Sequence, residues 1–181
     1  MTQTDPMRAT FCWWLTGLPG AGKTTLAQAL AQALRTEGLP VCVLDGDEVR
    51  QGLCKDLDFS PAARHENMRR VAEMATILNR NGIHAIVAMV SPTLAGRAEA
   101  RAIVGADRFL EVHVATPLSV CQARDPKGLY ARAKGGQAFG LTGVQSSYEA
   151  PASPQLVLDT SQIDIAQSLR LLRALESRAH A

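Results

Sequence analysis

The sequence predicts an α/β fold in which a five-stranded parallel sheet carries helices on both faces. Short apolar runs alternate along the chain with segments whose apolar residues recur three and four positions apart, the spacing of amphipathic helices. Some of these runs are continuously apolar, which is typical of parallel strands buried on both faces. A glycine-rich loop joins the first run to the first helical segment, and this order of strand, loop and helix fits the same fold class.

Each expected strand is a run of four to six mostly apolar residues. In chain order the expected strands are residues 11–16, 41–44, 85–90, 109–114 and 155–158.

The expected helices are recognised by their apolar spacing and by their boundary residues. Gly38 ends the first helix, and Ser60-Pro61 begins the third with a capping serine and a proline in the first turn. In chain order the expected helices are residues 23–36, 48–53, the segment from Pro61 to the stop at Asn81-Gly82, 94–104, 117–123 and 163–175.

The chain is expected to form one domain over residues 11–181. Residues 1–10 are polar, contain Pro6 and are expected to be a flexible tail. Residues 124–154 are rich in Gly, Lys, Ser and Pro and have no long apolar period, so we expect a functional loop or lid there.

Composition limits the partners and the compartment. The net charge of +2 is too small to indicate a nucleic-acid or membrane partner. The four cysteines have no metal-site spacing, which favours reduced thiols in a cytoplasmic protein. No apolar run approaches the ~20 residues of a membrane span, and the N-terminus does not have the pattern of a signal peptide.

The strongest motif is the loop from Gly17 to Thr24, GLPGAGKT, which fits G-x-x-x-x-G-K-[ST]. Its glycines let backbone N–H groups turn inward towards a phosphate chain, and the following helix points its positive end at the same anion. Lys23 can reach the β- and γ-phosphates, and the Thr24 hydroxyl can bind magnesium. The motif predicts a nucleotide and Mg²⁺ as ligands and favours a three-layer fold of the P-loop NTPase type.

The site is expected at one edge of the sheet, because ligands of parallel sheets bind beyond the carboxyl ends of the strands. The residues expected to share that edge are the Gly17 loop, Asp45 to Asp47, Ser91, Thr116 and Asp159.

Two aspartates follow the second strand. Asp45 and Asp47 can orient a magnesium-bound water or an acceptor hydroxyl beside the phosphates. The alternative is an Asp-Gly-Asp turn whose carboxylates cap a helix. The third strand ends in Ser91 rather than aspartate, and no N-K-x-D motif occurs, which counts against a GTPase.

Basic residues suggest an acceptor-side anion site. Arg50, Arg64, Arg69 and Arg70 surround Asn67, and arginine pairs bidentately with phosphate or sulfate. The alternative is a solvated helix face. Lys127, near the start of the lid, can neutralise charge on a transferring phosphoryl group.

Taken together, these residues resemble the adenylyl-sulfate kinase family over almost the whole chain, from Phe11 to about Leu175. The motifs that carry the resemblance are GLPGAGKTT (17–25), DGDEVR (45–50), GLCKDLDFS (52–60), Arg64 with EN-x-RR (66–70), VSP (90–92), ARDPKGLY (123–130), LTG (141–143), YEAP (148–151) and PQLVLDT (154–160). The resemblance implies transfer of the ATP γ-phosphoryl group to the 3′-hydroxyl of adenosine 5′-phosphosulfate (APS), giving PAPS and ADP in sulfate assimilation. It also implies that the chain can form a homodimer.

Position by position, the resemblance implies an ATP side and an acceptor side. The ATP side comprises Gly17, Leu18, Pro19, Gly20, Ala21, Gly22, Lys23, Thr24, Thr25, Arg124 and Thr160, with Thr24 and Asp45 at the metal. The acceptor side comprises Asp47, Arg50, Phe59, Arg64, Asn67, Val90, Ser91 and Leu141. The implied catalytic residues are Asp47, which faces the 3′-hydroxyl, with Lys23, Lys127 and Ser91, which matches a serine proposed as a phospho-enzyme site. Direct in-line transfer needs only positioning and charge stabilisation, so we do not expect an obligatory phosphoserine.

The chain departs from the family pattern at four positions. The family usually has an aromatic residue or histidine at the position of Thr93, and an arginine at that of Leu94. It usually has an aromatic residue at the position of Leu141, and asparagine is common at that of Glu48. Most of these changes lie on the acceptor side. Two alternatives therefore stay open: a kinase of the same fold that acts on another nucleotide, and a nucleotide-binding partner protein without catalytic activity.

Overall fold

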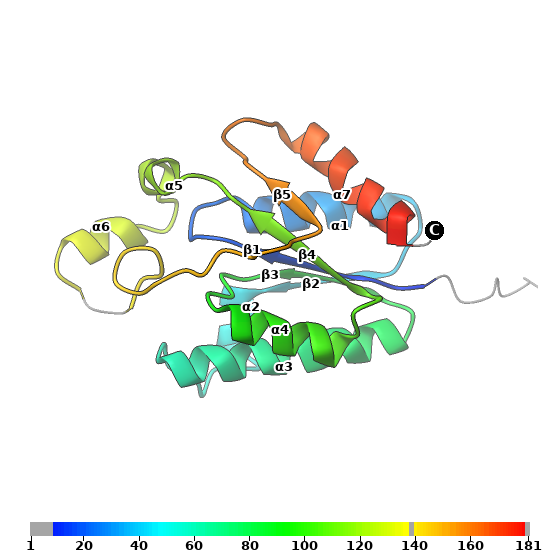
Figure 1. Ribbon diagram of the computed structural model, residues 1–181, viewed down its shortest axis with the longest axis horizontal. Coiled ribbons are helices and arrows are strands. Elements are labelled where there is room, and N and C mark those ends of the chain that lie inside the picture. The colour runs from blue at the N-terminus through cyan, green and yellow to red at the C-terminus, as the bar shows by residue number, and fades with distance from the viewer. Residues whose placement is uncertain (1–8, 138–139, 180–181) are drawn as a thin grey trace, which may run out of the picture.

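A computed structural model of the chain describes residues 9–137 and 140–179. Its centre is a five-stranded sheet in the order β2-β3-β1-β4-β5, and every strand pair is parallel (Figure 1). The strands are β1 (Cys12–Thr16), β2 (Val41–Asp45), β3 (His84–Ala88), β4 (Phe109–Val114) and β5 (Leu156–Leu158). The predicted fold class is confirmed.

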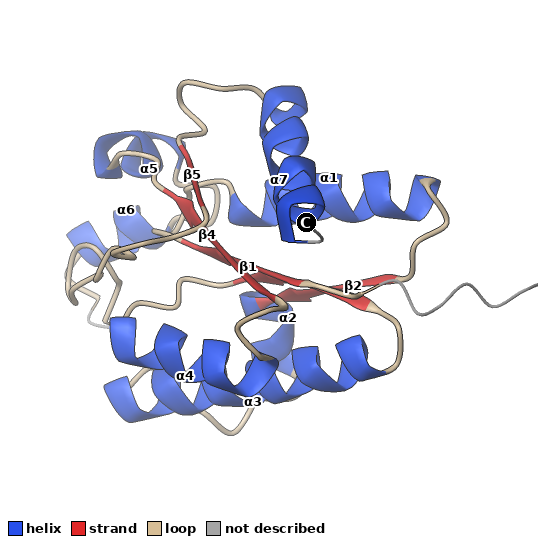
Figure 2. Ribbon diagram, turned by 45° about the vertical axis from the view of Figure 1, so that its right-hand side comes forward, coloured by secondary structure: helices blue, strands red, loops and turns tan. Residues whose placement is uncertain are grey.

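Helices cover both faces of the sheet, so the structure has three layers (Figure 2). The helices are α1 (Lys23–Thr36), α2 (Gly46–Gln51), α3 (Pro61–Arg80), α4 (Leu94–Val104), α5 (Leu118–Arg124), α6 (Leu129–Lys134) and α7 (Ile165–Ala179). Helices α1 and α7 lie on one face, and α3 and α4 lie on the other, while α5 and α6 lie beyond one end of the sheet (Figure 1).

Strand β1 lies in the middle of the sheet and contributes to both layers of the core. Trp13 and Leu15 pack in the cluster that contains α1 and α7, whereas Cys12 and Trp14 pack against α3 and α4. All five β1 residues are fully buried. Because successive side chains of a strand point to opposite faces, burial on both faces explains why residues 12–15 are all apolar.

Several predicted boundaries were wrong by a few residues, and side-chain capping explains two of them. Helix α2 begins at Gly46 rather than residue 48, because the Asp45 carboxylate accepts the backbone N–H of Asp47 at 3.0 Å. Helix α7 begins at Ile165 rather than residue 163, because Asp164 accepts the N–H of Gln167 at 2.7 Å.

The predicted lid contains a helix that the sequence analysis missed. Helix α6 has only six residues, too few to show an apolar period. The Asp125 carboxylate accepts the N–H groups of Tyr130 and Ala131 at 3.2 and 2.9 Å and so stabilises its first turn.

The predicted tail lies mostly outside the described residues. Thr10, which the prediction included in the tail, is buried, and its hydroxyl donates to the carbonyl oxygen of Asn79 at 2.8 Å. The packed structure therefore already includes Thr10. Within residues 9–137 and 140–179, no helix has the length and apolar character needed to cross a membrane.

Candidate active site

A cleft of about 1210 Å³ lies at the carboxyl edge of the sheet. The predicted site residues that line it are Pro19, Gly20, Gly22, Lys23, Thr24, Thr25, Asp45, Asp47, Arg50, Phe59, Arg64, Asn67, Val90, Ser91, Arg124, Lys127, Leu141 and Thr160. The structure thus brings residues from distant parts of the sequence to one place, as the parallel topology predicts.

Three residues of the glycine-rich loop do not line the cleft. Gly17 is needed for its conformation, because φ is +154° and a Cβ atom there would lie 2.4 Å from the carbonyl oxygen of Val114. Leu18 packs against the core and Ala21 is fully buried. The side chains of Leu18 and Ala21 therefore serve the packing of the loop.

Lys23 is held by its own loop. Its ammonium group donates to the carbonyl oxygens of Gly17 and Leu18, both at 2.8 Å. Lys23 is only 8% exposed, and burial lowers the pKa of its ammonium group to about 8. The N-cap of α1, Gly22, provides no side-chain hydrogen bond, so the first N–H groups of α1 are open to an anion.

The two predicted metal residues are in direct contact. The Thr24 hydroxyl donates to Asp45 Oδ2 at 2.7 Å. Asp45 also caps α2, so the capping interpretation of this residue is correct, and its other oxygen still faces the same cleft. The pair places a hydroxyl and a carboxylate at the mouth of the glycine-rich loop.

Asp47 and Lys127 face each other across the cleft. They form an ion pair between α2 and the lid, and their side chains are 60% and 53% exposed. Because both side chains are largely solvated, this pair adds little to stability. It does show that the lid lysine reaches the aspartate that follows β2.

A stacked group of side chains lines the far end of the cleft. The Arg50 guanidinium lies 4.3 Å from the centre of the Phe59 ring, and that of Arg64 lies 5.6 Å from it. Phe59 is 54% exposed, so most of its ring is open. Arg64 also donates to Gly140 O at 2.7 Å and to Thr142 Oγ1 at 3.0 Å, which connects α3 to the lid.

Asn67 is buried beside this group, with 3% of its surface exposed. Its Oδ1 atom has no hydrogen-bond partner among the described residues. A buried carbonyl oxygen without a partner is costly, so this amide is ready to accept a hydrogen bond from a ligand.

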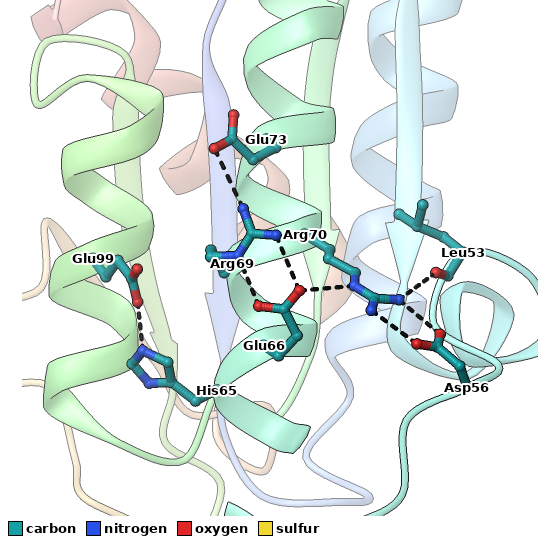
Figure 3. A network of polar contacts seen from close by, with 8 residues as sticks. All are labelled: Leu53, Asp56, His65, Glu66, Arg69, Arg70, Glu73 and Glu99. Atoms are coloured by element: carbon teal, nitrogen blue, oxygen red, sulfur yellow. Dashed lines mark hydrogen bonds and ion pairs between the residues drawn. The ribbon is translucent and has the colours of Figure 1, made fainter. Parts of the chain in front are cut away.

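Arg69 and Arg70, which we considered for the same anion site, do not line the cleft. Both are paired with acidic residues outside it, as Figure 3 shows. This part of the anion-site prediction was wrong, because their partners lie on α3 itself and on the turn before it.

Ser91 occupies a sharp corner after β3. It is 2% exposed and has φ of +47°, which is uncommon for a residue with a side chain. Its hydroxyl accepts the indole N–H of Trp14 at 2.9 Å.

Arg97 holds this corner and was missed by the sequence analysis. It donates to Ser91 O at 2.6 Å, to Glu149 O at 2.6 Å and to Glu111 Oε1 at 2.9 Å. No local pattern distinguishes Arg97 from an exposed helix arginine, since its partners come from three separate segments.

At the other end of the cleft, Arg124 and Thr160 are in contact. Arg124 donates to the Thr160 hydroxyl at 2.7 Å and to its carbonyl oxygen at 2.9 Å. The Thr160 hydroxyl also donates to Ala21 O at 2.9 Å, which ties this pair to the glycine-rich loop.

The sequence model of the family described as adenylylsulphate kinase matches residues 9–159 of this chain. The chain belongs to the adenylyl-sulfate kinase family. Two similar members are the adenylyl-sulfate kinases of Shewanella denitrificans and Shewanella amazonensis. The first is 52% identical over 161 residues, which cover 89% of this chain and 78% of the relative. The second is 55% identical over 152 residues, which cover 84% and 77%.

Solved structures of adenylyl-sulfate kinases support the same assignment. The Mycobacterium tuberculosis APS kinase in complex with AMPPNP and APS superposes with a TM-score of 0.87 at 41% identity, covering 93% of this chain and 98% of that one. A hexameric APS kinase from Thiobacillus denitrificans gives a TM-score of 0.71 at 35% identity, covering 98% of this chain and 31% of that one. As a member of the adenylyl-sulfate kinase family, the chain is an ATP-dependent phosphotransferase.

The departures from the family pattern have defined positions. Thr93 caps α4 through a hydrogen bond from Gly96 N at 3.3 Å, and Leu94 is 45% exposed. Leu141 is 4% exposed and lines the cleft, whereas Glu48 is exposed on α2. Of these four residues, Leu141 is the one that lines the cleft.

Proposed function

We propose that this chain transfers the γ-phosphoryl group of ATP to the 3′-hydroxyl of APS, giving PAPS and ADP. The observation that carries the proposal is the single cleft in which the glycine-rich loop, Asp47 and the Arg50–Phe59–Arg64 stack all meet. The loop fits the phosphates of a nucleotide, and the stack fits a second, anionic nucleotide. Asp47 lines the same cleft, and we infer that it lies where the phosphoryl group is transferred.

The ATP side is defined by the loop and by the Arg124–Thr160 pair. The loop N–H groups and Lys23 hold the phosphates, and the Arg124–Thr160 pair borders the adenine. The carbonyl oxygens that hold Lys23 lie in the same loop, so a nucleotide can draw the ammonium group away over a short path.

Thr24 and Asp45 fit a magnesium ion. Mg²⁺ prefers oxygen ligands and uses few protein groups when phosphates supply the others. Their oxygens lie 2.7 Å apart beside the loop. When bound, the ion would neutralise phosphate charge and align the reacting group.

In-line transfer then depends on three side chains. Asp47 accepts a hydrogen bond from the 3′-hydroxyl and orients it towards the γ-phosphorus. Lys23 and Lys127 stabilise the charge on the transferring group, and Lys127 leaves Asp47 as it does so. Ser91 shapes the pocket through its fixed corner, and the transfer needs no phosphoserine.

The acceptor side is built for a nucleotide with a second anion. The open face of Phe59 stacks on adenine, while Arg50 and Arg64 pair with the phosphosulfate. Asn67, Val90 and Leu141 complete the pocket wall.

The test is to incubate the purified protein with Mg²⁺, ATP and APS and to measure ADP and PAPS. AMP, ADP and other nucleotides replace APS in parallel, and Lys23→Ala controls for contaminating kinases. We expect PAPS with APS and poor use of the other acceptors. Turnover of another nucleotide but not of APS would favour a kinase of the same fold with a different acceptor. The departures from the family pattern at Thr93, Leu94 and Leu141 are the reason to test this alternative. Binding of ATP without any turnover would favour the non-catalytic partner.

We also propose an oligomeric state and a cellular compartment for this chain. We expect a homodimer, measured as the molar mass in solution by light scattering. We also expect a cytoplasmic location, with the thiols of Cys12, Cys42, Cys54 and Cys121 reduced.

A further inference from the structure

The Phe59 ring is presented by a short segment without helix or strand, residues 52–58, here called the acceptor turn. Two carbonyl oxygens of this turn accept hydrogen bonds from Arg50: Leu57 O at 3.2 Å and Asp58 O at 2.9 Å. The position of the turn therefore sets the position of Arg50 as well as that of Phe59, which follows it directly.

Few internal contacts hold the acceptor turn. Its backbone makes two hydrogen bonds within the turn, Lys55 N to Gly52 O at 3.2 Å and Leu57 N to Cys54 O at 3.1 Å. Cys54 is its one fully buried residue. A segment with so little buried surface needs contacts from outside to keep one conformation.

Arg70 of α3 supplies such contacts (Figure 3). Its guanidinium makes a bidentate pair with the Asp56 carboxylate, at 2.7 and 2.8 Å, and donates to Leu53 O at 3.1 Å. The planar fork of arginine fits this arrangement, and lysine could not reproduce it.

Glu66, one turn earlier on α3, fixes the orientation of that guanidinium. It accepts the Nε–H of Arg70 at 2.9 Å and two hydrogen bonds from Arg69, at 2.7 and 3.0 Å. The hydrogen bonds from Arg69 and Arg70 lower the pKa of Glu66 to about 2, so its carboxylate stays ionised at neutral pH. Arg69 shares this partner, but its other contact, Glu73, also lies on α3.

We propose that Arg70 is a positioning residue for the acceptor: it fixes the acceptor turn, and through the turn Arg50 and Phe59, without touching the substrate. This inference rests on the proposed function, because it assumes that Phe59 and Arg50 bind the acceptor nucleotide. Arg70 does not line the cleft, so its effect on binding must pass through the turn.

The test compares Arg70→Met with Arg69→Met, a matched control: Arg69 also pairs with Glu66, but it has no described contact with the acceptor turn. For Arg70→Met we expect a KM for APS about tenfold higher, because a small displacement of binding groups is costly. The KM for ATP and kcat should stay within about twofold of the wild type, and Arg69→Met should leave all three unchanged within about twofold. Arg70→Lys should recover only part of the loss.

Hydrogen exchange of the ligand-free proteins gives a readout that does not depend on activity. Amides of residues 52–58 should exchange faster in Arg70→Met and at the wild-type rate in Arg69→Met. Unchanged exchange in Arg70→Met, or faster exchange with an unchanged KM for APS, would overturn the inference. Equal increases in the KM values of APS and ATP would also overturn it, since they indicate a general loss of structure. If the wild-type enzyme is inactive on APS, the proposed function is overturned, and so is the inference that Arg70 positions the acceptor. The hydrogen-exchange result would still decide whether Arg70 fixes the acceptor turn.

Discussion

Binding of Mg²⁺-ATP should draw a proton onto Lys23, and the uptake should grow as the pH rises from 7 towards 8.5. In the ligand-free protein, burial lowers the Lys23 pKa to about 8, so the ammonium group is partly deprotonated above neutral pH. Phosphates placed beside it favour the charged form, so the pKa rises on binding. The direction is therefore proton uptake, not release.

The size of the effect follows from the lowered pKa. With a pKa of about 8, about a tenth of the lysine side chains are neutral at pH 7 and about half at pH 8. Binding should then take up about 0.1 proton at pH 7 and about 0.5 at pH 8. If only the charged form binds well, the affinity should fall about fourfold between pH 7 and pH 8.5.

Titration calorimetry in HEPES and in Tris measures this uptake, because the two buffers differ in ionisation enthalpy. The heat observed in each buffer at the same pH then gives the number of protons bound. Lys23→Met is the control and should bind more weakly, with no uptake that depends on pH in this range. Uptake near zero at pH 8, or equal uptake in Lys23→Met, would refute the argument from the buried ammonium group.

Three further predictions concern the cleft. Asp47→Asn should lower kcat by about 10²–10⁴-fold while ATP binding, measured by calorimetry, persists, and near-normal turnover would remove its assigned role. Phe59→Ala should raise the KM for APS by between about fivefold and a hundredfold through lost stacking, with an unchanged melting temperature because the ring is 54% exposed. Tyr130→Phe removes the 2.9 Å hydrogen bond to Pro19 O and should lower the free energy of unfolding by about 1 kcal/mol in urea denaturation. An equally stable Tyr130→Phe variant would show that this bond adds nothing to the glycine-rich loop.

The parts of the fold that could be predicted are those encoded by neighbouring residues. The glycine-rich loop is contiguous in the sequence, and the helix after it has a clear apolar period over its 14 residues. The central strands β1 and β3 could be recognised because they are buried on both faces, which makes them mostly apolar. The position of the cleft at the carboxyl edge of the sheet could be predicted from the parallel topology alone.

The missed features depend on contacts between distant residues. Arg70 has the same chemistry as Arg64, but a carboxylate 14 positions earlier, that of Asp56, turns it away from the cleft. Arg97 is buried only because segments far along the chain supply its acceptors. The six residues of α6 depend on the Asp125 carboxylate, and so short a helix leaves no periodic signal.

The contacts of Arg97 also connect one arm of the lid to α4. By holding Glu149 O at 2.6 Å, Arg97 anchors the returning arm of the lid to the body of the enzyme. The outgoing arm leaves α5 through Asp125 and Gly128, whose φ values of +22° and +63° mark a sharp bend. The two arms of the lid are therefore held differently: the returning arm is bonded to a buried arginine of α4, whereas the outgoing arm, which carries Lys127, begins at a bend. We therefore expect any change in the conformation of the lid to displace Lys127 further than Glu149.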